Sequence, residues 1–432
     1  MKTKTDIAVI GAGISGCAAA QELQANGVDY SLLEKNVDPG GLTRSISVGD
    51  AHFDYTGHYL HLARYNNPAE IPYAKQDNKK WQITKRKSVV FINETIVPAP
   101  LQYNLFALPL EIRNRYIKDY RNRPKTKQTK SLKEYLLSGF GTGMCENFFF
   151  PYNTKQMATS IESLSNEGIN RFFPNPDDKK IEQGFINDKN KSSSGYNDLF
   201  WYPKKQGISL LAKGLSSGLT DLHTCCEVEK IDIKHKLIFS AQGEIKYNRI
   251  LSSMPLNKLC DITNNSHLKS LSKSLKHNRV LCINLLFNGQ FDKKFDKCHW
   301  VYVPDPNILF YRLGFYSHFD YSYIAANQSA IYIETAINNE TPLPQINHVV
   351  NKVLLSLENL KWVNHKNCIV ISANWIDCAY IHFNQERERD LNQIFDILQN
   401  YAIYPIGRYG TWDYISMEDS IYSSIETAKR LI

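Results

Sequence analysis

The chain has 432 residues, a net charge of +8 and a hydrophobic fraction of 43%, so we expect two or three lobes with enough apolar residues to bury a core. Lysine and arginine are scattered apart from a run at 125–130, and no zinc-finger, RNA-binding or basic heptad pattern accompanies them. The composition therefore excludes a nucleic-acid-binding module of the common kinds.

The chain begins with a strand-turn-helix pattern. An apolar strand at 6–10 runs into Gly11, Gly13 and Gly16, and an alanine-rich helix follows. Gly11 permits a tight turn, Gly13 lets the backbone approach a pyrophosphate, and Gly16 allows close packing of helix on strand. The next strand ends at Glu34, about twenty residues on, where a ribose-binding acid is expected. The predicted cofactor contacts here are Gly11, Gly13, Ile14, Ser15, Gly16, Glu34 and Lys35.

The following turn distinguishes flavin from nicotinamide. Residues 38–44 read Asp-Pro-Gly-Gly-Leu-Thr-Arg, a Gly-Gly-x-x-Arg stretch that resembles the second pyrophosphate and ribityl contact of amine-oxidase and glutathione-reductase flavoproteins. This favours FAD over a diffusible NAD. Gly41, Leu42 and Arg44 are its predicted contacts.

The middle of the chain predicts a change of architecture. Residues 61–204 lack strong strand alternation, contain helical stretches such as 131–139, and carry a polar insertion at 188–194 that we expect to be a surface loop. A short helix near 207–212 and alternating strands at 227–233 and 236–240 follow.

The later strands, with Ser-Ser-Met-Pro at 252–255, resemble the returning half of the FAD domain in amine-oxidase-like proteins, where the strand at Val228 passes the adenine. Beyond them, strands at 279–286 and 330–335 and a helix near 346–357 indicate a second sheet. The predicted fold class is α/β. A discontinuous Rossmann-type FAD-binding domain spans 1–60, 205–255 and 396–432, a mainly helical cap region spans 61–204, and a substrate domain with a mixed or antiparallel sheet spans 256–395.

A terminal helix is predicted to begin near Met417. A helix N-terminus beside the isoalloxazine would stabilise negative charge on a reduced flavin. An ordinary capped helix with Ser416 as N-cap is equally consistent with the sequence. Gly407, Arg408 and Met417 are the predicted cofactor contacts in this region.

Four segments far apart in the chain form a further pattern when they are taken together in chain order. They are Phe-Asp-Tyr-Thr-Gly-His at 53–58, Val-Pro-Ala-Pro-Leu-Gln-Tyr-Asn at 97–104, Tyr-Val-Pro to Phe-Tyr-Arg at 302–312, and Gly-Arg-Tyr-Gly-Thr-Trp-Asp-Tyr at 407–414, with a fainter match at Pro151-Tyr152-Asn153. Together they resemble the UDP-galactopyranose mutase family, more its eukaryotic-type branch than its bacterial one. In that family N5 of reduced FAD attacks the anomeric carbon, UDP leaves, and the sugar ring recloses as the furanose.

The resemblance implies roles for particular residues. His58, Tyr311 and Arg312 are implied as catalytic, and Gly57 and His58 as flavin neighbours. The implied substrate contacts are Gln102, Asn104, Tyr152, Trp201, Tyr302, Tyr311, Arg312, Tyr380 and Tyr414. A buried diphosphate needs arginine and hydroxyl donors, and the positive net charge suits an anionic nucleotide sugar.

Purely structural roles for several of these residues remain open. Arg312 is embedded in apolar sequence and must be paired if it is buried, either by a ligand phosphate or by a structural carboxylate. His58 is also consistent with a satisfied interior histidine, and Gln102 and Asn104 with caps of a loop between prolines.

The chain also departs from the family pattern. Phe-Trp-Tyr-Pro at 200–203 places Trp201 where the family has an arginine, although Lys204 or Lys205 can restore charge. Trp201 favours the alternative of an amine-oxidase-like or protoporphyrinogen-oxidase-like oxidoreductase. A non-catalytic FAD-binding protein is a third possibility.

Nine cysteines without a C-x-x-C pair indicate reduced thiols and a cytoplasmic protein. We propose no metal site. A strand that starts at residue 6 leaves no room for a signal peptide, and no apolar run is long enough to span a bilayer. The sequence leaves the oligomeric state open.

Overall fold

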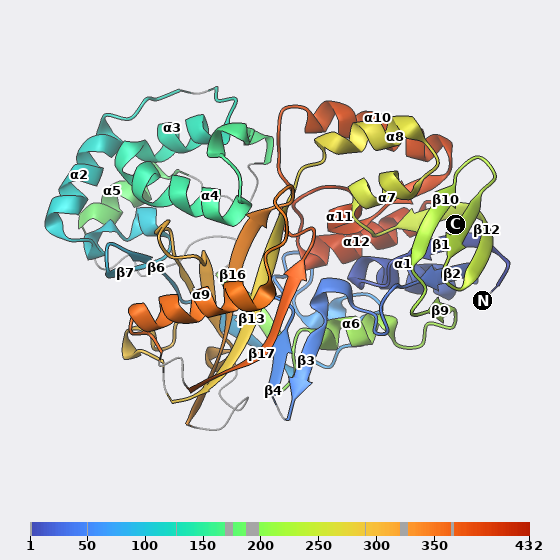
Figure 1. The fold of residues 1–432 in the computed structure, drawn as a ribbon, viewed down its shortest axis with the longest axis horizontal. Coiled ribbons are helices and arrows are strands. Elements are labelled where there is room, and N and C mark those ends of the chain that lie inside the picture. The colour runs from blue at the N-terminus through green and yellow to red at the C-terminus, as the bar shows by residue number, and fades with distance from the viewer. Residues whose placement is uncertain are drawn as a thin grey trace.

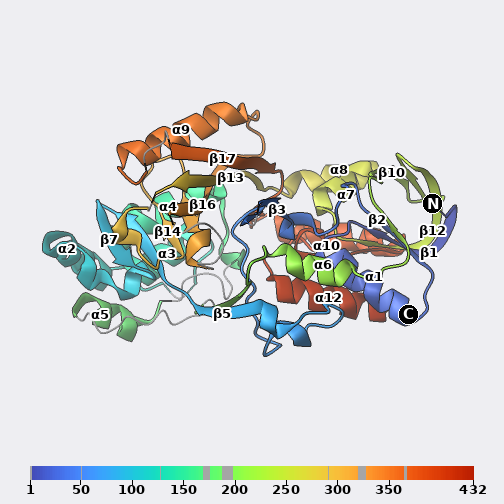
Figure 2. The same ribbon diagram turned by 90° about the horizontal axis from the view of Figure 1, so that it is seen from below.

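The computed structural model describes residues 2–49, 51–126, 128–168, 176–186, 198–289, 291–319, 327–363 and 367–432. The polar stretch 188–194 lies outside these residues. Two large sheets lie beside each other along the long axis of the molecule (Figures 1 and 2). In the described part of the chain, no helix is long and apolar enough to cross a membrane.

The first sheet is assembled from strands that are far apart in the sequence. Its order is β10-β11-β12-β1-β2-β9, and β18 also pairs with β12. The strands are β1 (Lys4–Ile10), β2 (Tyr30–Leu33), β9 (Leu222–His223), β10 (Val228–Asp232), β11 (Leu237–Ser240), β12 (Gly243–Ser252) and β18 (Ile403–Pro405). β2, β1, β12, β18 and β9 run parallel, while β10 and β11 add antiparallel pairings. This is the predicted Rossmann-type α/β arrangement.

Helices cover both faces of the first sheet. α1 (Ile14–Ala25), α6 (Ser209–Ser216) and α12 (Met417–Lys429) pack on the face that Ile7 and Val9 of β1 enter. α7 (Leu256–Ile262), α8 (Ser266–Leu271) and α10 (Arg387–Asn400) pack on the other face, with Ala8 and Ile10. β1 is apolar throughout its second half because both of its faces are covered.

The second sheet has the order β17-β13-β16-β15-β14-β6-β7. Its strands are β6 (Ser88–Ile92), β7 (Thr95–Pro98), β13 (Asn278–Asn288), β14 (Trp300–Tyr302), β15 (Arg312–Phe315), β16 (Gln328–Asn338) and β17 (Cys368–Ile376). All neighbouring pairs are antiparallel except β14 with β6. α9 (Ile346–Asn359) covers one face (Figure 2). The other face, at Cys282 and Tyr332, packs on an aromatic core that includes Phe53 and Phe200.

Strands also occur where the sequence predicted mainly helices. Within 61–204 the structure has β5 (Trp81–Lys85), which pairs with β8 (Leu199–Pro203), and the hairpin β6–β7, which joins the second sheet. β6 is almost entirely buried and therefore reads as an apolar run without the alternation that marks a half-exposed strand. Its turn residues Asn93 and Glu94 both have positive φ, as a two-residue hairpin turn requires.

The remaining helices form a group above the second sheet at one end of the molecule (Figure 1). They are α2 (Leu110–Arg121), α3 (Leu132–Met144), α4 (Phe150–Met157) and α5 (Asp178–Ile186). Upstream, a small hairpin joins β3 (Ser45–Val48) to β4 (Ala51–Asp54). The division of the chain into three domains stays a proposal, and α10 spans the expected boundary at 395.

Candidate active site

Two glycine turns meet at the edge of the first sheet. Gly11 has φ +90°, and a Cβ on Gly16 would overlap the carbonyl oxygen of Gly11, so only glycine lets α1 start directly after β1. The Gly40 N–H donates to the Ala12 carbonyl at 2.7 Å. A Cβ on Gly41 would lie 3.2 Å from the Gly13 Cα. The two turns therefore form one narrow backbone cradle at the start of α1, as an anion-binding turn requires.

Glu34 lies in this cradle. Its carboxylate accepts the Ala12 N–H at 2.8 Å and the Asn36 N–H at 2.9 Å, and it is buried. Arg44 donates from Nε to the Gly41 carbonyl at 2.9 Å and stacks over Tyr55. These side-chain contacts hold the backbone of the two turns in place.

The other predicted cofactor residues take varied positions. Ile14 is half-buried at the start of α1, Ser15 is buried next to Gly407, Lys35 is exposed, Leu42 is half-buried, and Val228 is buried at the start of β10. Gly407 has φ +67°, and it opens the short helix α11 (Gly407–Gly410). α12 begins at Met417 with Ser416 as its N-cap and a reciprocal bond from Asp419, which confirms the predicted cap.

Arg312 is paired with a buried carboxylate. It begins β15 and lies opposite Glu334 of β16 in the strand register. The guanidinium donates from Nε to Oε2 and from Nη2 to Oε1, each at 2.8 Å. Burial acts to raise the pKa of Glu334, but the charge of Arg312 and the hydrogen bonds from Arg312, Thr56 and Tyr311 together hold this pKa below its usual value. Of the two partners that the sequence left open, the structure supplies the carboxylate.

Glu334 collects further donors. Its carboxylate accepts the Tyr311 hydroxyl at 2.7 Å, the Thr56 hydroxyl at 2.6 Å and the Gly57 N–H at 3.4 Å. A Cβ on Gly57 would lie 2.5 Å from the Tyr332 ring. Glu334 therefore holds the 53–58 segment against the second sheet and fixes the backbone next to His58.

His58 lies near two arginines, Arg312 and Arg408. Its ring is hydrogen-bonded to the Leu42 backbone, and its Nδ1 is shielded from solvent without a partner in the described part of the chain. Burial, followed by the charges of Arg408 and Arg312, lowers the pKa of His58 to about 4 against the opposing effect of Glu334. The imidazole is thus neutral at pH 7 and has one ring nitrogen that the protein itself does not use.

Five tyrosines gather around the two arginines, and we call them the tyrosine cluster: Tyr152, Tyr302, Tyr311, Tyr380 and Tyr414. The Tyr152 ring makes edge contacts with Tyr302 and Tyr311, with centroids 5.4 and 6.3 Å apart. Tyr380 stacks on Tyr414 at 6.1 Å. Tyr380 also lies close enough to Arg312 for its pKa to respond to that charge, which connects the two groups of rings.

Arg408 completes the cluster. Its guanidinium lies 3.9 Å from the Tyr414 ring centroid and donates from Nη1 to the Ile415 carbonyl at 3.2 Å. Its Nε is shielded and unpartnered among the residues described here. With Arg312 neutralised by Glu334 and His58 uncharged, Arg408 leaves the site with a net positive charge suited to an anionic group.

The other predicted substrate residues are Trp201, Gln102 and Asn104. Trp201 lies on β8, where its backbone pairs with Leu60, and its side chain packs against the core of the first sheet. Gln102 and Asn104 are buried on a short turn beside the core that also contains Tyr311. Asn104 donates to the Pro100 carbonyl at 2.9 Å, but its Oδ1 is shielded and without a partner in the described segments.

Sequence reasoning missed Glu334 and Glu418. Glu334 follows the buried residues 330–333, so a carboxylate in an apolar run was the same signal that identified Arg312. Glu418, in the first turn of α12, is buried and accepts the N–H groups of Ala63, Arg64 and Tyr65 at 2.7 to 3.1 Å. It had no comparable signal, because acids are common in the first turn of any helix.

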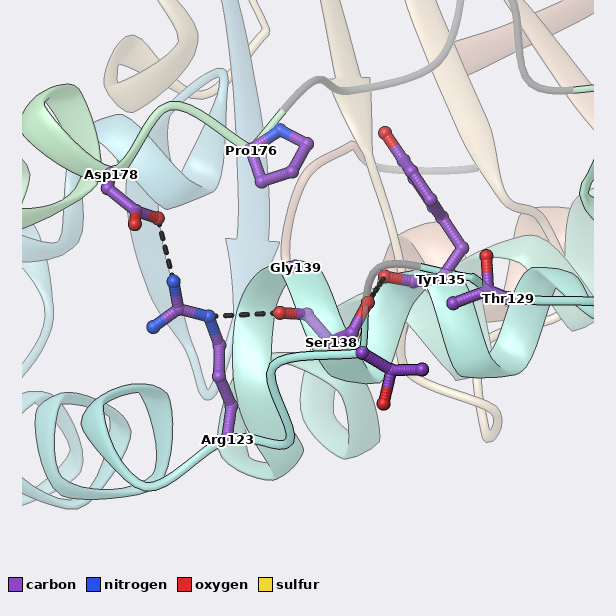
Figure 3. A pocket seen from close by; sticks show the side chains of 8 residues that line it. Arg123, Thr129, Tyr135, Ser138, Gly139, Pro176 and Asp178 are labelled. Atoms are coloured by element: carbon purple, nitrogen blue, oxygen red, sulfur yellow. Dashed lines mark hydrogen bonds and ion pairs between the residues drawn. The ribbon is translucent and has the colours of Figure 1, made fainter.

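A cavity of about 300 Å³ lies elsewhere, in the helical group (Figure 3). Arg123 on its wall is paired with Asp178 at 2.7 Å and with the Ser138 carbonyl at 3.0 Å. The lining residues come from 123–139 and 176–178, and none belongs to the tyrosine cluster or the glycine turns. We therefore do not assign the chemistry to this cavity.

Comparison with known proteins extends these findings. Residues 9–72 match the family model of an NAD(P)-binding Rossmann-like domain. The whole fold is similar to reduced UDP-galactopyranose mutase, with a TM-score of 0.90 and 22% identity over 99% of this chain and 95% of that chain.

Two oxidases share the same fold. A proposed protoporphyrinogen oxidase from Exiguobacterium sp. 255-15 has a TM-score of 0.74 and 13% identity over 100% of this chain and 99% of that chain. Cyclohexylamine oxidase from Brevibacterium oxydans IH-35A has a TM-score of 0.68 and 11% identity over 99% and 98%, respectively. At these identities the likeness establishes the fold, which a mutase and oxidases have in common.

Proposed function

We propose that the chain is a flavin-dependent sugar-nucleotide mutase, of the kind that interconverts UDP-galactopyranose and UDP-galactofuranose, and that it serves polysaccharide or glycoconjugate synthesis in the cytoplasm. The observation that carries this proposal is the convergence of the tyrosine cluster with Arg312 and Arg408 beside the glycine turns. The similarity of the whole fold to a UDP-galactopyranose mutase supports it.

FAD fits the residues present. The cradle of Gly11, Gly13 and Gly41 admits a pyrophosphate only because no Cβ fills it, and Glu34 lies where a ribose would be bound. His58 Nδ1 and Arg408 Nε are shielded polar atoms without a protein partner in the described residues, as expected of atoms that face a bound ring.

When bound and reduced, FAD would supply an electron-rich ring nitrogen beside the sugar. The chain's own residues would bind and orient the substrate. Arg312 and the hydroxyls of Tyr302 and Tyr414 would hold the diphosphate, and Arg408, beside the flavin, would add a second positive charge. His58, neutral at pH 7, donates to the Leu42 backbone and would accept a hydrogen bond at Nδ1 without adding charge.

The test is anaerobic incubation of the purified protein with UDP-galactofuranose and, separately, UDP-galactopyranose, with and without prior dithionite reduction. We expect interconversion only after reduction and no net consumption of reductant, as followed by chromatography of the nucleotides. Absence of conversion in both directions with a fully flavin-loaded protein would reject these substrates.

One observation favours an oxidoreductase as the second candidate. Trp201 packs into the core of the first sheet, so the second arginine that the mutase family uses is not replaced at that position. An oxidase would react through its oxidised flavin, whose visible absorbance would bleach when an amine or porphyrinogen substrate is added without oxygen. Such bleaching, with no sugar-nucleotide conversion, would favour the oxidase.

A further inference from the structure

A half-buried lysine connects the helical group to the loop between β14 and β15. Lys155 lies on α4, and its Nζ donates to the carbonyl oxygens of Val303 at 2.9 Å, Asp305 at 2.7 Å and Phe310 at 2.7 Å. An ammonium group has three N–H donors, so all of them are used on a single loop.

This loop carries site residues at both of its ends. Tyr302 closes β14 and Arg312 opens β15, and the two are paired in the strand register. On α4, Tyr152 precedes Lys155 by three residues and so shares its helix face. The Tyr152 ring meets the Tyr302 ring edge-on at 5.4 Å. One helix face therefore contacts the rings of the cluster and, one turn later, the loop that joins them.

The tip of the loop borders a cavity that the helical group also lines, at Pro151 of α4. Pro304, Asp305, Pro306 and Ile308 line a cavity of about 410 Å³. Burial lowers the pKa of Lys155 to about 7, and the Asp305 carboxylate acts against that shift. Below this pH the lysine carries the full set of donors that the three carbonyls accept.

We propose that Lys155 is a positioning residue, which gathers the 303–310 loop so that Tyr302 and Arg312 face the substrate together. The effect on substrate rests on the proposed function, whereas the effect on the loop does not. Without the ammonium, three carbonyls of the loop lose a charged donor at the edge of this cavity. Tyr302 and Arg312 stay paired through β14 and β15, but they lose the loop contacts that set how their side chains face the substrate.

The test compares Lys155→Met with Lys133→Met at pH 6. Lys133, on α3, forms an ion pair with Glu162 at 2.7 Å and both side chains are well exposed, so it is a matched control in the same helical group. Hydrogen exchange by mass spectrometry reports on the loop, and UDP titration reports on the site. We expect exchange in peptides covering 303–311 to accelerate about tenfold or more, and UDP affinity to fall at least about tenfold, in Lys155→Met alone. Flavin content should not change.

Unchanged exchange at 303–311 in Lys155→Met overturns the proposal, whatever happens to UDP affinity. Faster exchange with unchanged UDP affinity also overturns it, because the loop would then not position the site. If the parent protein binds no UDP, the proposed function fails, and exchange alone decides whether Lys155 holds the loop. If Lys155→Met does not fold, Lys155→Gln keeps part of the donor set, and an intermediate acceleration is expected from it. Absence of any acceleration in Lys155→Gln would contradict the proposal.

Discussion

At the scale of single residues, the site depends on charges that are buried in pairs. Arg312 and Glu334 satisfy each other through two hydrogen bonds of 2.8 Å, and the remaining oxygen capacity of Glu334 is taken by Tyr311 and Thr56. Removing one member of such a pair costs more than removing both, because the survivor is left buried without compensation.

We therefore expect Glu334→Gln to lower the free energy of unfolding by about 3 to 5 kcal/mol. The double variant Glu334→Gln with Arg312→Met should be less destabilised than Glu334→Gln alone. Denaturant unfolding of the parent, both single variants and the double variant completes the cycle. Additive losses would show that the two side chains do not act as a pair.

His58 gives a pH dependence whose sign follows from its lowered pKa. Its folded pKa is about 4, below the unfolded value near 6.5. The unfolded state binds the proton more readily in this interval, so this contribution to stability is present above pH 6.5 and is lost as the pH falls toward 4.

Between pH 7 and pH 4, the parent should lose roughly 2 to 3 kcal/mol more stability than His58→Gln, whose side chain does not titrate. Denaturant midpoints at both pH values measure the difference. Equal losses of stability in the parent and the variant would show that His58 is not the group responsible for the pH dependence.

At the scale of elements, two glycines of the turn between β1 and α1 have different roles. A Cβ on Gly16 would overlap the Gly11 carbonyl, whereas a Cβ on Gly13 would meet only the Gly41 Cα at 3.9 Å. Gly13 also has an ordinary φ of −70°. Gly16 is thus required by the protein's own packing, and Gly13 is not.

We expect Gly16→Ala to destabilise the protein. Gly13→Ala should leave the thermal midpoint of the flavin-free protein nearly unchanged. It should lower flavin affinity by about tenfold or more, since a methyl group would enter the cradle. Thermal unfolding and flavin titration separate the two effects. Normal flavin binding by a stable Gly13→Ala protein would exclude this turn as the pyrophosphate site.

At the scale of the whole molecule, Asp54 joins the two sheets. Its carboxylate accepts the Tyr202 hydroxyl at 2.7 Å and, from the core of the first sheet, the Ile208 N–H at 2.9 Å. Its carbonyl accepts from Asn284 of the second sheet at 2.8 Å. Burial raises the pKa of Asp54 to about 6 against the effect of these donors. Asp54 is therefore a buried contact between the first sheet's core and the second sheet.

Asp54→Ala should lower the stability by about 3 kcal/mol or more, because several buried donors lose their acceptor together. Ser45→Ala removes a single donor to the same carboxylate at 2.6 Å and should cost only about 1 kcal/mol. Thermal and denaturant unfolding of both variants test this. Similar small losses in the two would mean that Asp54 does not join the halves.

The sequence by itself determined the elements whose geometry is local. The glycine turn, the acid at the end of β2, the capped start of α12 and the strands β10 and β11 depend on residues close together in the chain, and the structure has them near the predicted positions. The hairpin β6–β7 was missed because burial of β6 removes the alternation on which strand prediction depends.

Only the tertiary structure decided which charges meet. Glu334 lies opposite Arg312 because β15 and β16 pair in one particular register. Lys155 reaches the 303–310 loop because α4 packs over a sheet whose strands come from distant parts of the chain. Trp201 packs against the core of the first sheet, on a strand whose partner β5 lies more than a hundred residues earlier in the chain. Such pairings depend on the packing of whole elements, and the residue order along the chain does not encode them locally.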